Sequence, residues 1–227
     1  MDKTLIITQS NYIPWKGYFD LLRNADVFVV FDEVQYTKRD WRNRNKLICN
    51  NGPKWLSIPV KTKNNFSQKI SRTEVLNDNW INDHLNFIEN NYRRAKCFDE
   101  YFPIIKSIIV ESQNKYLSKI NVKIIKNLLD LLGISIEIID SSQLELAEEK
   151  NDKLISVCNQ LNIKNYITGP SALSYIDEKK FIESNISIRV FEYKNYKQYE
   201  QLWNGFDHNV SIIDMFLNLG IKTKDYL

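Results

Sequence analysis

Short apolar runs separated by an amphipathic stretch open this chain. Thr4–Thr8 and Val27–Phe31 are almost continuously apolar, which is typical of strands buried on both faces of a sheet. Between them, Pro14 forbids a continuing strand and suits the first turn of a helix. The apolar residues within 15–25 follow helical spacing. Strand, tight loop, helix and strand together predict a βαβ unit of a parallel sheet.

Residues 45–60 predict a β-hairpin. Apolar stretches at 46–48 and 55–58 flank the sequence Asn50-Asn51-Gly52-Pro53, and Asn-Gly is a strong signal for a turn between two strands. Because proline lacks a backbone N–H group, we expect Pro53 to lengthen the loop.

Helical spacing dominates residues 78–132, where helices are expected over 78–92, 101–111 and 116–132, the last ending at Gly133. The alternation then returns, with strands at 135–139, 165–168 and 186–191 and helices at 148–161, 176–185 and 210–219. The pattern predicts an α/β fold: a three-layer, Rossmann-like, mostly parallel sheet with a small β-hairpin and a helical insertion. We expect residues 1–227 to form a single domain, with the insertion at 78–132.

Composition narrows the class of protein. The chain has 227 residues, 43% of them hydrophobic and 26% charged, which is typical of a globular protein with a hydrophobic core. Its net charge of +3 is too small to attract nucleic acid or a membrane surface over the whole molecule, although a local basic patch is compatible with it. Three widely spaced cysteines, no apolar run near the ~20 residues that span a bilayer, and no signal-peptide pattern predict a cytoplasmic protein. With two histidines, no metal site is predicted.

Two polar segments follow the first two expected strands. Gln9–Asn11 and Asp32–Gln35 both fall at strand carboxyl ends, where ligands bind in open α/β sheets. The first segment continues into Tyr12 and Trp15, and could either hold a ligand or be a turn whose rings fill the core. Asp32 and Glu33 could bind the metal ion of a metal–nucleotide complex, act as a general base, or bind an amine or a sugar hydroxyl group. The alternative is that the two carboxylates are solvated or ion-paired at the end of a strand and have no role in a site.

The densest basic cluster interleaves cations with an indole and two amides. It consists of Lys38, Arg39, Trp41, Arg42, Asn43, Arg44 and Asn45. Guanidinium groups recognise phosphate bidentately and amides suit sugar or base edges, so we expect a polyphosphate-facing role, with Trp41 able to stack on a base. The small size of the cluster favours a nucleotide or nucleotide-sugar over a long polymer.

Two weaker candidates complete the set. Gly169 and Ser171, after an expected strand, could offer backbone amides to a ligand or simply form a turn. His84 shares a helix face with aromatic residues, where a packed core histidine is the favoured interpretation and a catalytic base the alternative.

Several separated motifs resemble the WbqC-like protein family: QSNYIPWKGYF, DEVQYTKRDWRNRN, WLSIPV, YITGPSALSYID and SIIDMFLNLG. They occur in order and cover nearly the whole chain. The family usually has proline after the glutamine, where this chain has Ser10, so the loop is less rigid here. The positions that match in the first two motifs are Gln9, Tyr12, Pro14, Trp15, Gly17, Tyr18, Asp32, Gln35, Arg39, Trp41, Asn43, Arg44 and Asn45.

The resemblance implies a bacterial protein encoded with enzymes of surface-polysaccharide (O-antigen) biosynthesis. It implies a transferase or ligase that forms an amide on a nucleotide-linked amino sugar, for example with glycine on a dTDP-linked amino-dideoxy sugar. Asp32, Glu33 or His84 would then orient or deprotonate the amine. The alternative is a non-catalytic nucleotide-sugar-binding or assembly protein of the same pathway.

The opening βαβ unit is also similar to that of HIGH-type nucleotidyltransferases such as pantothenate synthetase, which join an acid to an amine through an acyl-adenylate. This similarity implies ATP, or another activated acyl or aminoacyl donor. However, Trp15-Lys16-Gly17-Tyr18 stands where the HxGH signature would be. Aminoacyl-tRNA is a further donor, although the overall charge does not indicate it.

Overall fold

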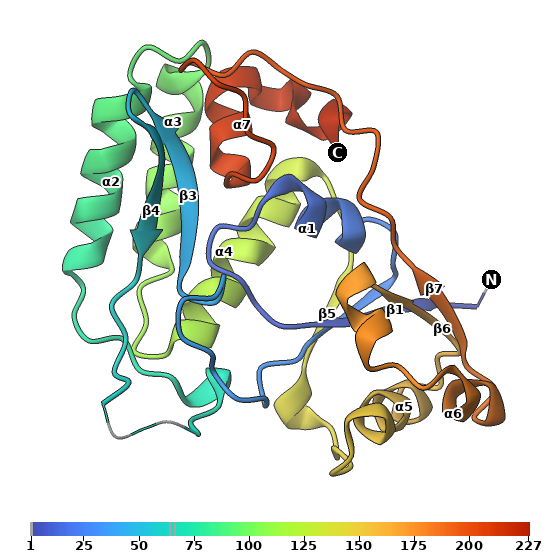
Figure 1. Cartoon of the computed structure of the whole chain (residues 1–227). Coiled ribbons are helices and arrows are strands. Elements are labelled where there is room, and N and C mark those ends of the chain that lie inside the picture. Colours follow the sequence, from blue (N-terminus) through green and yellow to red (C-terminus); the bar gives the residue numbers. More distant parts are fainter. Residues whose placement is uncertain (1, 64, 66) are drawn as a thin grey trace.

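A five-stranded parallel sheet forms the centre of the computed structural model, which describes residues 2–63, 65 and 67–227 (Figure 1). The strand order is β5–β2–β1–β6–β7, and each neighbouring pair is parallel. The bounds are β1 Thr4–Thr8, β2 Val27–Val30, β5 Glu137–Asp140, β6 Asn165–Thr168 and β7 Ser187–Val190. The predicted α/β class with a mostly parallel sheet is confirmed.

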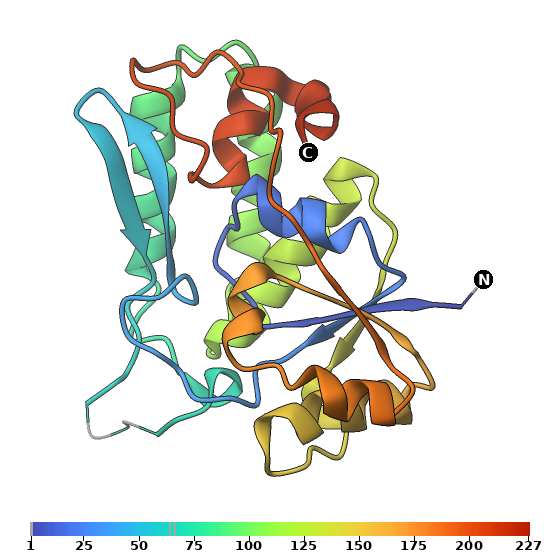
Figure 2. The ribbon, with the colours of Figure 1, turned by 45° about the vertical axis from the view of Figure 1, so that its right-hand side comes forward.

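Helices cover both faces of this sheet, and the period-two alternation of the strands decides which side chains face which helices. Ile6 and Phe28 share a core with α1 (Lys16–Leu22) and α4 (Leu117–Leu132). Leu5 and Val27 share a second core with α5 (Lys150–Gln160) and α6 (Glu178–Glu183). Figure 2 shows the two helical layers on opposite sides of the sheet. Burying each such side chain contributes about 1.5–3 kcal/mol.

The predicted hairpin forms a separate two-stranded sheet, β3 (Arg44–Cys49) with β4 (Gly52–Ser57). Its loop is shorter than expected, because Cys49 pairs with Gly52 and Pro53 pairs with Ile48 inside the ladder. The prediction that Pro53 lengthens the loop was therefore wrong. Within the described part of the chain β4 pairs with β3 alone, so a proline without an N–H group is tolerated there.

Three helices occupy most of residues 78–132: α2 (Asn79–Tyr92), α3 (Phe98–Glu111) and α4. The hairpin lies beside α2 in both ribbon views, and α7 (Ile212–Leu219) contacts α3 and β3. The short 3₁₀ helices are η1 Ile70–Arg72, η2 Ser141–Gln143, η3 Pro170–Ser174 and η4 Gly220–Tyr226. That 78–132 is an insertion in a single domain stays a prediction. Within the described ranges, every helix is too short or too polar to cross a membrane.

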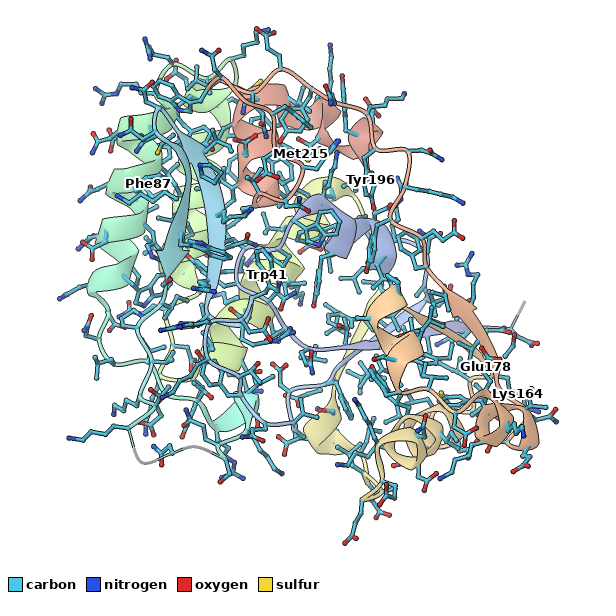
Figure 3. All side chains as sticks on the ribbon, in the orientation of Figure 1. Trp41, Phe87, Lys164, Glu178, Tyr196 and Met215 are labelled. Atoms are coloured by element: carbon cyan, nitrogen blue, oxygen red, sulfur yellow. The ribbon has the colours of Figure 1, made fainter. Side chains whose placement is uncertain are left out.

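The chain between β7 and α7 runs past α1 without regular secondary structure (Figure 1). We call residues 192–210 the strap. Its aromatic side chains pack on the start of α1: the ring centroids of Tyr193 and Tyr196 lie 5.3 and 6.0 Å from that of Trp15. Figure 3 labels Tyr196 beside α1, where its hydroxyl donates to Asp20 at 2.6 Å. The strap is thereby held against the start of α1 by Tyr193 and Tyr196.

Candidate ligand-binding site

A cavity of about 560 Å³ lies at the carboxyl ends of β1 and β6, and we call it the strand-end pocket. β1 has β2 on one side, reached through α1, and β6 on the other side. Successive strands are thus added on one side of β1 and later ones on the other, which makes the β1–β6 edge the topological switch point where open α/β sheets bind ligands. The volume falls within the range of roughly 300–1,000 Å³ that is usual for small-molecule sites.

Two lysines give this pocket a positive wall. Lys150 and Lys153 lie one turn apart at the start of α5 and both line the cavity. Among the described residues, no carboxylate lies within ion-pairing distance of either ammonium group, in contrast to the paired Lys46 and Lys69. The Lys150 ammonium sits 3.3 Å from the centroid of the Tyr175 ring. The wall therefore offers two positive charges to an anionic ligand.

Aromatic and amide groups complete the lining. Tyr175 and Tyr193 contribute rings, while Gln9 and Gln35 contribute side-chain amides from the ends of β1 and β2. Gly169 follows β6, and a Cβ atom added there would lie 3.3 Å from the Tyr193 hydroxyl oxygen. Glycine thus lets the ring of Tyr193 approach the backbone. The pocket combines cations, rings and amides, which are the groups that recognise phosphates, bases and sugar hydroxyls.

A second cavity, of about 370 Å³, lies between the β1–α1 loop and the hairpin, and we call it the hairpin pocket. Two indoles and three asparagines line most of it, together with a proline and Lys46. These residues are Asn11, Pro14, Trp15, Trp41, Asn45, Lys46 and Asn209. The Lys46 ammonium is paired with the Asp207 carboxylate at 3.0 Å, so this lining carries little net charge.

The Trp15 and Tyr193 rings connect the two cavities. Trp15 lines the hairpin pocket and Tyr193 lines the strand-end pocket, with 5.3 Å between their centroids. Gly17 determines where the indole lies, because a Cβ atom there would come within 2.3 Å of its Cζ2 atom. A glycine is therefore required at the second position after Trp15, because the Trp15 indole lies against the first turn of α1.

The loop that borders both pockets is held by Asp32. This carboxylate is 1% exposed and accepts hydrogen bonds from the Ser10 backbone N–H at 2.9 Å, the Ser10 hydroxyl at 2.6 Å and the Ser118 hydroxyl. Burial raises the pKa of Asp32, against the hydrogen bonds from both serines and the charge of Arg42, which lower it. Both of its oxygens are thus engaged inside the protein, where they hold the β1–α1 loop.

Side chains of the basic cluster hold the same loop. The Asn45 amide donates to the backbone carbonyls of Tyr12 and Ile13, at 3.3 and 2.8 Å. The Arg42 guanidinium donates to the Ser10 carbonyl at 3.3 Å and to the Asn11 side chain. These bonds hold Ile13 at φ +36°, a conformation that a β-branched residue adopts only when its surroundings impose it.

The structure divides the residues of the sequence prediction between several places. Gln9, Gln35, Gly169 and Ser171 line the strand-end pocket, and Asn11, Trp15, Trp41 and Asn45 line the hairpin pocket. The remaining candidates line neither cavity. They are Tyr12, Asp32, Glu33, Arg39, Asn43, Arg44 and His84.

The basic-cluster residues that we expected to bind phosphate have other partners within the protein. Arg42 is bound to the β1–α1 loop, as described above, and its Nε lies 3.5 Å from Asp40. The Arg44 guanidinium stacks on the Trp55 ring at 4.1 Å, and the Asn43 amide donates to the Ile58 carbonyl at 2.8 Å. Positive charge at the strand-end pocket comes instead from α5.

The other proposed bases are also engaged. The carboxylate of Glu33 pairs with the Lys69 ammonium at 2.8 Å; burial raises its pKa, but the hydrogen bonds from Lys69 and Ser71 outweigh burial and leave the pKa lowered. His84 is 4% exposed, its Nδ1 lies 2.8 Å from the Tyr12 hydroxyl, and burial lowers its pKa to about 4. His84 thus packs in the core, which was the favoured interpretation of its helix face.

Sequence reasoning missed the α5 lysines and the strap. Lys150 and Lys153 sit at i and i+3 in the first turn of a helix that follows a strand, and that spacing is visible in the sequence. Tyr175 lies in the YITGPSALSYID motif and was available as a signal. Tyr193 and Asn209 come from a segment without periodicity, and no sequence pattern points to them. Among the described residues, no group of three or more His, Cys, Asp and Glu has the geometry to hold a metal.

Comparison with known proteins relates this chain to one curated protein and to one protein family. It is 42% identical over 225 residues to an uncharacterized protein, Rv1507c, of Mycobacterium tuberculosis, an alignment that covers 99% of this chain and 97% of that protein. No solved structure matches it. The model of the WbqC-like protein family matches residues 9–226, and the chain belongs to that family.

Proposed function

We propose that this protein binds a nucleotide-linked amino sugar in the strand-end pocket and forms an amide on the sugar amine. It would act as an acyl or aminoacyl transferase, or as an ATP-dependent ligase, in a cytoplasmic step of surface-polysaccharide assembly. One observation carries the proposal: the cavity at the switch point joins Lys150 and Lys153, which have no described carboxylate partner, to tyrosine rings and glutamine amides.

The chemistry of this lining suits a nucleoside diphosphate. Lys150 and Lys153 supply point charges for the two phosphates, and Tyr175 and Tyr193 supply faces on which a base can stack. Gln9 and Gln35 supply donors and acceptors for ribose hydroxyls or base edges. Family membership supports the sugar, since the resemblance links WbqC-like proteins to polysaccharide assembly.

Amide formation would require an activated donor. The neutral sugar amine attacks the acyl carbon, the C–N bond forms, and the bond from carbon to the leaving group breaks. No carboxylate or imidazole belongs to the described lining of either pocket, so we assign the amine proton to the departing group of the donor. An acyl-adenylate, a thioester or an aminoacyl ester each provides such a group.

The same lack of acid–base side chains supports a second candidate function. A protein that binds the nucleotide-sugar and passes it to a partner needs cations, rings and amides but no base. The two functions share the strand-end pocket and differ only in whether a covalent product forms.

Binding is tested with the variant Lys150→Ala/Lys153→Ala. UDP and dTDP affinities are measured by titration calorimetry, with Lys222→Ala/Lys224→Ala, two exposed lysines of η4, as the control of equal charge change. Loss of two charged contacts at a partly exposed site should weaken nucleotide binding at least about tenfold. Equal affinities in the wild type and both variants would refute the nucleotide site.

Catalysis is tested with dTDP-4-amino-4,6-dideoxyglucose and, in turn, glycine with ATP, glycyl-tRNA and acetyl-coenzyme A. Product mass distinguishes the two functions. A mass increase that depends on Lys150 and Lys153 establishes the transferase or ligase. Binding of the nucleotide-sugar without product from any donor establishes the non-catalytic alternative.

A further inference from the structure

The strand-end pocket and the hairpin pocket are separated by very little protein. Gln9 lines the first and Asn11 lines the second, and two residues of chain span at most about 7 Å. The Trp15 and Tyr193 rings make a second link, one ring lining each cavity with 5.3 Å between centroids. The two cavities are therefore close enough to receive two parts of one extended ligand.

The linings of the two cavities differ in charge. The strand-end pocket presents two ammonium groups, whereas Lys46, the one cation among the described lining residues of the hairpin pocket, is neutralised by Asp207 at 3.0 Å. Trp15, Trp41, Asn11 and Asn209 also line the hairpin pocket, whereas the Asn45 amide is already bound to the Tyr12 and Ile13 carbonyls. Indole faces stack on the C–H faces of sugar rings, and amides pair with hydroxyl groups in both directions. This lining suits an uncharged, hydroxyl-rich ring rather than a phosphate.

Trp41 is held rigidly at the edge of the hairpin pocket. Its backbone carbonyl accepts from the Tyr12 N–H at 3.0 Å, and its ring lies 5.2 Å from that of Trp55, which is stacked in turn under Arg44. Even so, Trp41 remains 38% exposed, and Figure 3 labels it between the hairpin and α1. An exposed indole with a fixed backbone loses little conformational entropy when a ligand stacks on it.

We infer that the hairpin pocket holds the sugar half of the nucleotide-linked sugar, with Trp41 as its stacking face and Asn11 beside it. The inference rests on the proposed function, because it requires the nucleotide half to occupy the strand-end pocket. The ligand then passes from one cavity to the other along Gln9–Asn11 and across Trp15 and Tyr193. Selectivity for the sugar would come from a different part of the chain than affinity for the nucleotide.

The test compares each free diphosphate with its sugar conjugate. Affinities are measured for dTDP and dTDP-4-amino-4,6-dideoxyglucose, and for UDP and UDP-N-acetylglucosamine, in wild type, Trp41→Ala, Trp41→Phe and Trp203→Ala. Trp203 is the matched control, a partly buried indole that also lies under an arginine, Arg94 at 5.3 Å. Circular dichroism and the melting temperature check that every variant is folded.

In the wild type, at least one conjugate should bind about tenfold more tightly than its free diphosphate, as one stacked ring can provide. Trp41→Ala should remove that difference and leave the diphosphate affinity unchanged, Trp41→Phe should keep part of it, and Trp203→Ala should keep all of it. If diphosphates bind but the difference is absent, or survives in Trp41→Ala, the sugar assignment is wrong and the nucleotide site stands. If neither diphosphate binds, the proposed function fails first.

Discussion

Gly17 allows the most direct test of how the two pockets are built. The substitution Gly17→Ala introduces a methyl group 2.3 Å from Cζ2 and 2.5 Å from Cη2 of the Trp15 indole. Carbon atoms in contact need about 3.5–4 Å, so the indole must move by an ångström or more. Trp15 lines the hairpin pocket and packs on Tyr193 of the strand-end pocket, so its displacement should disturb both cavities.

Two opposing effects set the size of the stability change. Alanine is favoured over glycine within a helix by about 1 kcal/mol, whereas forcing a packed ring out of position costs about 1–3 kcal/mol. Because the clash involves a ring held by Tyr193 and Tyr196, we expect the second effect to win, with a net loss of about 1–2 kcal/mol. Without the indole, the first effect acts alone.

A double-mutant cycle separates the two effects. Urea unfolding is measured for the wild type, Gly17→Ala, Trp15→Ala and the double variant. In the Trp15→Ala background, Gly17→Ala should be neutral or stabilising by up to about 1 kcal/mol. Gly169→Ala, whose methyl group would lie 3.3 Å from the Tyr193 hydroxyl, is the milder control. Equal effects of Gly17→Ala with and without the indole would refute the reasoning.

Two buried polar groups give further predictions. Burial lowers the pKa of His84 to about 4 in the folded protein, whereas in the unfolded chain His84 binds a proton near pH 6.5. The free energy of unfolding should therefore be highest above pH 6.5 and fall by roughly 3 kcal/mol as the pH drops to 4. Urea midpoints of wild type and His84→Asn measure this, and equal pH slopes would contradict it. Asp214 accepts a hydrogen bond from the Tyr199 hydroxyl at 2.6 Å, so Tyr199→Phe should cost about 1.5–3 kcal/mol. The control Tyr226→Phe, in a ring that only packs on Tyr199, should cost about 0.5 kcal/mol or less by thermal unfolding, and equal losses would argue against the Asp214 contact.

The sheet could be predicted because its signals are local. Thr4–Thr8 and residues 165–168 appear in the structure with the expected bounds, since short apolar runs buried on both faces have few alternatives. The hairpin was predicted from Asn-Gly, but the place of Pro53 in its ladder was not. That place depends on β4 having no strand on its outer side, which is a property of the assembled fold.

The candidate site could be predicted only in part, for a related reason. The strand-end rule pointed to Gln9 and Gln35, which line a cavity in the structure, because it depends on strand polarity alone. The basic cluster did not indicate the cations of the strand-end pocket, since charge density in a sequence does not show which cations already have partners within the protein. Arg42 and Arg44 have such partners, whereas Lys150 and Lys153, much further along the chain, are not paired with any described carboxylate.

The strained β1–α1 loop explains why the motifs QSNYIPWKGYF and DEVQYTKRDWRNRN occur together in this chain. Ile13 at φ +36° costs about 1–3 kcal/mol that a glycine would avoid, and it persists because Asn45 binds the Tyr12 and Ile13 carbonyls, on either side of the Ile13 Cα atom. A loop that only connected a strand to a helix would not need this strain. In the resulting loop conformation, Asn11 and Trp15 line the hairpin pocket and Gln9 lines the strand-end pocket. The QSNYIPWKGYF and DEVQYTKRDWRNRN segments are therefore best understood as a loop and the residues that hold it, one physical unit that shapes both cavities, while α5 supplies the positive charge at the strand-end pocket.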